Sequence, residues 1–211
     1  LIEWAKRNDS WIIEDDYDSE FHYSGKPTAC VQGLDPHDRT IYIGTFTKSL
    51  FPSLRIGYLV LPPQLVRPMT VARTVLDGYA APITQLTLAR FIDGGHFGAH
   101  VRAMRAVYAE RLETLASLVE RHLSSFLEAR VPIGGLQMPC LLTCDVSERA
   151  IFDAAQRNGI KLFGTSALFA GGKGTPGFLL GFAAYTPHEI ELSVKKLANV
   201  FHSLTSKQAL S

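Results

Sequence analysis

The sequence predicts an α/β protein with two lobes joined by a long helix. Short apolar runs alternate with helical stretches before residue 96, and one long segment from His96 to about Leu127 repeats apolar residues at helical spacing. Shorter strand and helix patterns follow that segment. Strands that alternate with helices are typical of α/β folds, and a helix of this length spans roughly 40 Å at 1.5 Å per residue.

The first lobe contains three predicted strands. Leu1–Arg7 resembles the last turns of an amphipathic helix already under way, so we expect the chain to be a piece of a longer protein. An apolar run at 11–13 ends in carboxylates, which is typical of a parallel strand that opens on a site. Thr40–Thr45 predicts a second strand, and Ile56–Leu61 predicts a third, buried one. Residues 23–39 predict a loop that can hold a helical turn.

Helices dominate the remaining pattern. Pro63 opens one helix and Ile83–Ile92 forms another, which ends at Asp93-Gly94-Gly95. Beyond the long helix we expect a strand near 137–144, a helix near 147–158, a strand near 178–184 and a helix over 187–204. These expectations divide the chain into residues 1–95, a connecting helix at 96–128 and a small lobe at 129–211.

Composition excludes several classes of protein. Hydrophobic residues make up 46% and charged residues 19%, an ordinary globular mixture and not that of a disordered or fibrous chain. The 21 Lys and Arg nearly balance the 20 Asp and Glu, so the sequence does not predict a dominant basic surface for nucleic acid. Since no apolar run approaches the ~20 residues of a membrane span, we expect no membrane partner.

The cysteines and histidines do not predict a metal site. Cys30, Cys140 and Cys144 form no regular framework, which indicates a reducing compartment and a cytoplasmic location. If 139–144 is a strand, Cys140 and Cys144 share one face, where zinc would need two more ligands, so we interpret them as buried thiols. His96 and His100 have the spacing of a two-His site, but the Glu of a zinc hydrolase motif is missing between them.

Three features of the first 60 residues could carry chemistry. An acidic run, Glu14–Glu20, follows the first strand; a lysine flanked by hydroxyls, Lys48, follows the second; and Arg55 enters the third. Taken singly, each has a structural interpretation: a solvated or metal-binding loop, a surface lysine and an ion-pair partner.

Taken together, the three features point to one cofactor. A lysine amine condenses with a carbonyl when its site favours the deprotonated form. Hydroxyls at Thr45 and Thr47, with Arg55, supply donors for a phosphate. A carboxylate 33 residues before Lys48 could hold a pyridinium nitrogen protonated. This combination matches pyridoxal 5′-phosphate (PLP).

The residues from Ile12 to Pro62 resemble a known family. The strings 13–21 (Ile-Glu-Asp-Asp-Tyr-Asp-Ser-Glu-Phe), 42–52 (Tyr-Ile-Gly-Thr-Phe-Thr-Lys-Ser-Leu-Phe-Pro) and 54–58 (Leu-Arg-Ile-Gly-Tyr) are similar to the aminotransferase-like domain of MocR-type bacterial transcription regulators. Residues 94–111 also resemble the start of that group's interdomain helix. The similarity extends over nearly the whole chain and is strongest before Arg111.

The resemblance implies a fold and a set of roles. The fold would be the C-terminal part of a fold-type-I large domain (1–95), the interdomain helix (96–128) and the small domain (129–211). Lys48 would form a Schiff base with PLP and act as the catalytic lysine. Asp15 would pair with the ring nitrogen and Tyr17 with the ring oxygen. The residues that would hold the phosphate are Thr45, Thr47 and Arg55.

The resemblance also implies partners. The effector would be a small amine or amino acid, and the full-length protein would be a homodimer. DNA would be bound only through an N-terminal winged-helix domain, which lies outside these residues.

One departure from the family pattern bears on activity. Where an aminotransferase of this superfamily has the arginine that grips a substrate carboxylate, this chain has Leu179, and no arginine follows Arg157. A leucine cannot make a bidentate contact to a carboxylate. Transamination is therefore doubtful, although an active aminotransferase for an amino acid or amine stays an alternative. A fragment that folds poorly and binds nothing is a third interpretation.

Overall fold

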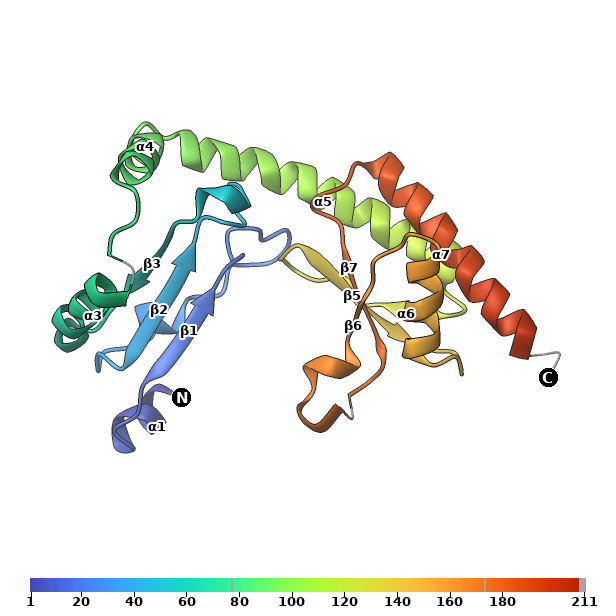
Figure 1. Cartoon of the computed structure of the whole chain (residues 1–211), viewed down its shortest axis with the longest axis horizontal. Helices are drawn as coiled ribbons and strands as arrows, with labels where there is room; N and C mark the ends of the chain where they lie inside the picture. The colour runs from blue at the N-terminus through green and yellow to red at the C-terminus, as the bar shows by residue number, and fades with distance from the viewer. Residues whose placement is uncertain (77, 173, 209–211) are drawn as a thin grey trace. The chain divides into compact units, whose positions relative to one another are not determined.

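The structure is a computed structural model that describes residues 1–76, 78–172 and 174–208. It divides into two compact units, an N-terminal unit of Leu1–Ala103 and a C-terminal unit of Met104–Ser211. The division falls within the long helix α5, His96–Leu123 (Figure 1). We describe each unit by itself. The domain boundaries inferred from the sequence stay predictions.

The N-terminal unit contains a three-stranded sheet in the order β1-β2-β3. Strand β1, Ile12–Asp16, pairs in parallel with β2, Thr40–Thr45, and β2 pairs antiparallel with β3, Gly57–Val60. The three predicted strands are confirmed, as is the parallel direction of the first. Because β1 and β2 are parallel, their carboxyl ends lie at the same edge of the sheet.

The prediction that the third strand is buried is wrong. Every residue of β3 is exposed, with Tyr58 at 43% and Leu59 at 44%. In the described part of the chain β3 is an edge strand that pairs only with β2. A continuous apolar run indicates burial on both faces, but only neighbouring elements can supply that burial.

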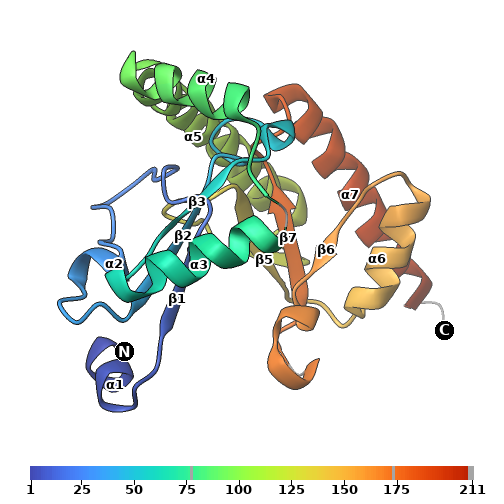
Figure 2. The same ribbon diagram turned by 60° about the vertical axis from the view of Figure 1, so that its left-hand side comes forward.

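Helices surround this sheet (Figure 2). Two of them begin with a proline, whose missing N–H is harmless at a helix start: α3, Pro63–Leu76, and α4, Pro82–Asp93. The other helical segments of the unit are α1, Ile2–Arg7, the short α2, Val31–Leu34, and the 3₁₀ turn η1, Pro52–Leu54. The Glu14 side chain accepts hydrogen bonds from the N–H groups of Val31 (2.8 Å) and Gln32 (2.9 Å), which fixes α2 against β1.

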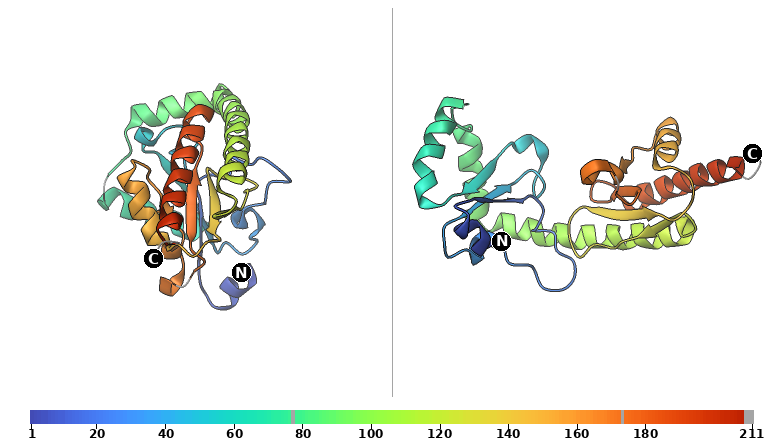
Figure 3. Two further views of the ribbon diagram at one scale, coloured as in Figure 1. Left: turned by 90° about the vertical axis from the view of Figure 1, so that its right-hand side faces the viewer. Right: turned by 90° about the horizontal axis from the view of Figure 1, so that it is seen from below.

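The C-terminal unit, drawn in yellow-green to red in Figure 3, contains a sheet. The strands of this antiparallel sheet follow the order β4-β5-β7-β6. Its strands are β4, Leu127–Ala129, β5, Gln137–Leu142, β6, Phe163–Gly164, and β7, Gly177–Gly181. The C-terminal part of α5 belongs to this unit, together with α6, Glu148–Arg157, and α7, Pro187–Gln208. The described residues also include two 3₁₀ turns, η2 at Ser166–Leu168 and η3 at Ala170–Gly172.

The long helix is shorter than the sequence pattern indicates. We expected it to continue to about Leu127, but α5 ends at Leu123, and Leu127–Ala129 forms β4 against β5. Leu127 is 2% exposed, so its burial is equally consistent with a helix and with a strand. Strand pairing, which the local spacing does not report, decides between them.

An aromatic core holds the C-terminal unit together. Phe178, Phe182 and Phe201 are completely buried, and the rings of Phe126 and Phe201 stack at 5.1 Å. Helix α6 packs against α7. None of the helices in the described ranges combines the length and apolar character that a membrane span requires.

Candidate active site

The candidate site lies at the carboxyl ends of β1 and β2. Asp15 is paired with Ile43 and Asp16 with Gly44 in the register of the two strands. Register partners share a face of the sheet, and side chains alternate between faces, so Asp15 and Thr45 belong to the same face. Asp16 belongs to the opposite face.

A turn of hydroxyl groups leads from β2 to Lys48. Thr45 Oγ1 lies 3.0 Å from Thr47 Oγ1 and accepts a hydrogen bond from the N–H of Thr47 at 3.2 Å. Lys48 itself is exposed. The next residue, Ser49, is 1% exposed, and its carbonyl oxygen is 3.0 Å from Nε2 of His100. The turn is therefore fixed on both sides of a lysine whose amine reaches solvent.

The hydroxyl of Ser49 is a further polar group beside Lys48. In the described part of the chain this buried oxygen has no hydrogen-bond partner. A buried polar atom without a partner is rare in folded proteins and marks a place where a water molecule or ligand can bind. Sequence reasoning noted Ser49 only as a hydroxyl beside Lys48 and did not indicate that it is buried.

Arg55 lies beside the turn that contains Thr45 and Thr47. Thr45 Oγ1 donates to the carbonyl oxygen of Ile56 at 3.4 Å, and the N–H of Phe46 donates to the same oxygen at 3.1 Å. These bonds hold Arg55, the residue before Ile56, beside Thr45. Arg55 follows η1 with a left-handed backbone, φ 53° and ψ 39°. Such strain in a residue other than glycine is concentrated at functional sites.

The acidic run lies at the same edge. Partial burial works against ionisation of Asp16, but hydrogen bonds from Ser19 and Tyr42 dominate and lower the pKa of this carboxyl group. Burial and the charge of Asp16 raise the pKa of Asp18, while the charge of Lys48 acts in the opposite direction. Lys48 is therefore close enough to the acidic run to interact with it electrostatically.

The structure thus brings five of the predicted site residues to one edge of the sheet: Asp15, Thr45, Thr47, Lys48 and Arg55. Tyr17 directly follows β1, and its side chain is 49% exposed. Within the described ranges, the carboxylate of Asp15 has no hydrogen bond or ion pair of its own. An aspartate, a lysine, hydroxyls and a guanidinium at one edge can bind a phosphorylated, nitrogen-containing ring.

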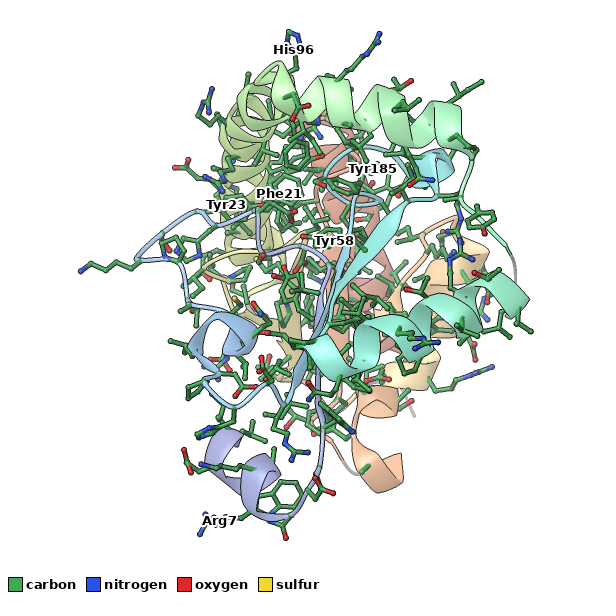
Figure 4. The ribbon with its side chains drawn as sticks, turned by 90° about the vertical axis from the view of Figure 1, so that its left-hand side faces the viewer. Arg7, Phe21, Tyr23, Tyr58, His96 and Tyr185 are labelled. Atoms are coloured by element: carbon green, nitrogen blue, oxygen red, sulfur yellow. The ribbon has the colours of Figure 1, made fainter. Side chains whose placement is uncertain are left out.

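Two histidines near the site have ordinary partners. The His100 ring lies beside the Ser49 carbonyl, and the exposed His96 ring lies 5.7 Å from the ring of Phe91, at the outward start of α5 (Figure 4). Among residues 1–76, 78–172 and 174–208, no three His, Cys, Asp or Glu side chains form a group able to hold a metal ion.

In the C-terminal unit, Leu179 lies on β7 between Pro139 of β5 and Phe163 of β6. Phe163 is 52% exposed, so this face of the sheet presents apolar side chains.

On the opposite face of the same sheet, Cys140 is fully buried, and burial raises the pKa of its thiol to about 12. The interpretation of Cys140 as a buried thiol is confirmed. The strand was expected to reach residue 144, but β5 ends at Leu142, so Cys144 lies beyond the strand and is only partly buried.

The fold matches part of the fold of a fold-type-I aminotransferase. A kynurenine aminotransferase of Pyrococcus horikoshii, solved in complex with PMP, superposes with a TM-score of 0.87 and 28% identity, over 96% of this chain and 50% of the other. The predicted fold class, a partial large domain followed by a smaller α/β domain, is confirmed.

The sequence comparison identifies the kind of aminotransferase-like protein. The chain is 38% identical over 210 residues to the probable rhizopine catabolism regulatory protein MocR of Rhizobium meliloti, and it covers 43% of that protein. It is 36% identical over 197 residues to an uncharacterized HTH-type transcriptional regulator of Bacillus subtilis, 42% of which is covered. No model of a protein family matches the chain.

These relatives fit a MocR-type aminotransferase-like domain, so the predicted resemblance is confirmed. The chain spans less than half the length of these curated relatives.

Proposed function

We propose that this chain is the PLP-binding effector domain of a MocR-type regulator, with Lys48 as the residue that bonds to the cofactor. The observation that carries the proposal is the common sheet edge shared by Asp15, Thr45, Lys48 and Arg55. The similarity to an aminotransferase solved in complex with PMP supports it.

The chemistry of these residues fits PLP. The hydroxyls of Thr45 and Thr47, with the guanidinium of Arg55, would hold the phosphate. The carboxylate of Asp15 would accept the hydrogen bond of a protonated ring nitrogen, and the phenol of Tyr17 would donate to the ring oxygen. Bound PLP supplies an electron sink for reactions at an amine carbon.

The chain's own residues would do three things. The amine of Lys48 would hold the cofactor covalently through its aldehyde group. Asp15 would keep the proton on the ring nitrogen, because its negative charge favours the cationic ring. Thr45, Thr47 and Arg55 would orient the cofactor by its phosphate, so that its aldehyde faces Lys48.

Absorbance tests the assignment directly. PLP added to the protein should produce a visible band, and borohydride reduction should leave the pyridoxyl group on the peptide that contains Lys48. Lys48→Ala should lose both signals. The matched variant Lys26→Ala, which removes an exposed loop lysine, should keep both. A label on another lysine, or an unchanged band in Lys48→Ala, would contradict the proposal.

Regulation by this domain requires partners. The effector would be a small amine or amino acid, because such compounds react with PLP. DNA would be contacted by a separate N-terminal winged-helix domain, and the full-length protein would work as a cytoplasmic homodimer. An effector changes regulation only if it binds two states of the whole protein with different affinity.

A second candidate function is catalysis by the same lysine. The 28% identity to a kynurenine aminotransferase favours it, and Leu179 opposes it, because an aliphatic side chain cannot hold a carboxylate. Rapid conversion of bound PLP to the pyridoxamine form by amino donors would identify an aminotransferase. Stable binding without that conversion would support an effector domain.

A further inference from the structure

A group of hydrogen bonds surrounds the carboxylate of Asp16, whose side chain lies on the face of β1 opposite to Asp15. The Tyr42 hydroxyl donates to Asp16 Oδ2 at 2.7 Å, and the Ser19 hydroxyl donates to the same oxygen at 2.6 Å. The N–H of Ser19 donates to Oδ1 at 3.2 Å. One carboxylate thus joins strand β2 to the loop that follows β1.

Tyr42 also lies beside a tyrosine of β3. The rings of Tyr42 and Tyr58 lie 6.0 Å apart and are tilted by 37° to each other. Burial and the hydrogen bond to Asp16 raise the pKa of Tyr42, so the hydroxyl stays protonated as a donor.

The position of the Tyr58 ring depends on a glycine. Tyr58 lies on β3 (Figure 4), and a Cβ atom at Gly44 would lie only 2.3 Å from its Cζ atom. The other side of Tyr58 is limited by Phe46, at 5.5 Å between ring centroids, and Phe46 in turn meets Phe97 edge-on at 5.7 Å. The ring therefore has little freedom, although 43% of Tyr58 is exposed.

We propose that Asp16, held by Tyr42 and Ser19, is a positioning residue for Asp15 and Tyr17. This inference rests on the proposed PLP site. Asp15 lacks a partner of its own in the described part of the chain, so only its backbone sets its direction. Asp16 is the next residue, and its side chain points to the other face. Anchoring Asp16 therefore fixes the peptide planes on both sides of it.

The test compares PLP binding by the whole chain and by variants of this hydrogen-bond set. Tyr42→Phe removes one donor and keeps the ring. Asp16→Asn keeps an oxygen acceptor, and Asp16→Ala removes the acceptor entirely. Asp9→Asn is the matched control, because Asp9 is an exposed aspartate that pairs with Arg39 at 2.7 Å, away from the Asp16 set. The readouts are the dissociation constant of PLP and the ratio of its visible to near-ultraviolet absorbance.

The hydrogen bond to a charged group that is lost here is worth a change of about tenfold in an equilibrium constant, and this sets the size of the largest effect expected on PLP affinity. Tyr42→Phe and Asp16→Ala should therefore weaken PLP binding about tenfold and change the absorbance ratio, because Asp15 no longer holds the ring nitrogen in one geometry. Asp16→Asn should recover most of the affinity, and Asp9→Asn should match the wild type.

Three outcomes separate the proposals. If Tyr42→Phe binds PLP with wild-type affinity and an unchanged absorbance ratio, the positioning role is wrong. If circular dichroism shows that Asp16→Ala is unfolded, the PLP affinity and absorbance ratio of Tyr42→Phe alone decide whether Asp16 has the positioning role. If the wild type shows no visible band with PLP, the proposed function fails, and the positioning role fails with it.

Discussion

The two units bury their apolar side chains to very different extents. In the C-terminal unit, large side chains such as Phe178, Phe182 and Phe201 are completely inaccessible to solvent. In the described part of the N-terminal unit, the buried hydrophobic residues are Ala5, Phe21, Leu88 and Val101. Helix α3 contains no buried residue at all, and its Val75 and Leu76 are 79% and 82% exposed.

The difference shows that the units depend on different forces. Burial stabilises a fold by roughly 25 cal/mol per Å² of apolar surface, so the C-terminal unit is stabilised mainly by its own core. In the N-terminal unit, carboxylates organise the connecting segments. Glu14 holds α2, and Asp35 accepts hydrogen bonds from the N–H of Arg39 (2.7 Å) and the hydroxyl of Thr40 (2.8 Å). The candidate site is built on this hydrogen-bonded frame.

Truncation of the C-terminal core should have the largest effect. Phe178→Ala removes a completely buried ring and should lower the free energy of unfolding by about 3–5 kcal/mol. The matched variant Val75→Ala, on the exposed side of α3, should change it by less than about 0.5 kcal/mol. Urea unfolding followed by circular dichroism measures both. Equal losses would contradict the contrast between the units.

Neutralising a hydrogen-bonded carboxylate of the C-terminal unit should have the second largest effect on the free energy of unfolding. Glu148 accepts hydrogen bonds from the N–H groups of Ser166 (3.2 Å) and Gly177 (2.9 Å) and from the Ser166 hydroxyl (2.6 Å). Partial burial opposes ionisation, but these bonds lower the pKa of Glu148 below 4.5. Glu148→Gln should therefore reduce the free energy of unfolding at pH 7 by about 2 kcal/mol.

The pH dependence follows from the direction of that shift. A lowered pKa means that the folded state binds the proton of Glu148 more weakly than the unfolded state does. The stabilisation is present above pH 4.5 and is lost as the pH falls through the folded-state pKa. Urea midpoints of the wild type and Glu148→Gln should converge in acid. A difference that stays constant down to the folded-state pKa would show that the charge of Glu148 is irrelevant.

A methyl group added in the N-terminal unit tests its hydrogen-bonded frame. Gly44→Ala would bring a Cβ atom within 2.3 Å of Tyr58, so either the tyrosine ring or β2 must move. We expect a loss of about 1–2 kcal/mol, measured by urea unfolding. The control is Gly181→Ala in the C-terminal unit, where no atom lies within 4 Å of the added carbon. A larger loss of stability in Gly181→Ala than in Gly44→Ala would contradict the expectation that Gly44 is the tightly packed glycine of the two.

Relief of the strain at Arg55 should produce the smallest change. A left-handed backbone costs an L-residue roughly 1–2 kcal/mol, and glycine removes this cost. Part of the gain is lost again, because glycine has more conformational freedom in the unfolded state. Arg55→Gly should raise the free energy of unfolding by up to about 1 kcal/mol, whereas Arg55→Ala, which keeps the strain, should not. Both should weaken PLP binding if Arg55 holds the phosphate. An Arg55→Ala protein as stable as Arg55→Gly would show that the backbone is unstrained.

Much of the secondary structure follows from local pattern. The strand at Thr40–Thr45 and the helices that open at Pro63 and Pro187 occur where the spacing predicts them. The strands β4 and β6 were not predicted, because runs of three and two residues are too short to establish a period. The candidate site residues came from short strings around Lys48, and their roles stay predictions.

The hydrogen bonds behind the site could not be found in the same way. Asp16 and Tyr42 are far apart in the chain, and only the parallel register of β1 and β2 brings the Tyr42 hydroxyl to the Asp16 carboxylate. The sequence contained all the residues of the set, but no local spacing connects them.

By itself, the sequence determined the type of the longer elements and the chemical groups available near Lys48, because both depend on residue type and on neighbours in the chain. The tertiary structure alone decided that β3 is an exposed edge and that Asp15 and Asp16 belong to opposite faces with different partners. Those outcomes depend on strand pairing and on which surfaces other elements cover. Neither is encoded in the spacing of a single segment.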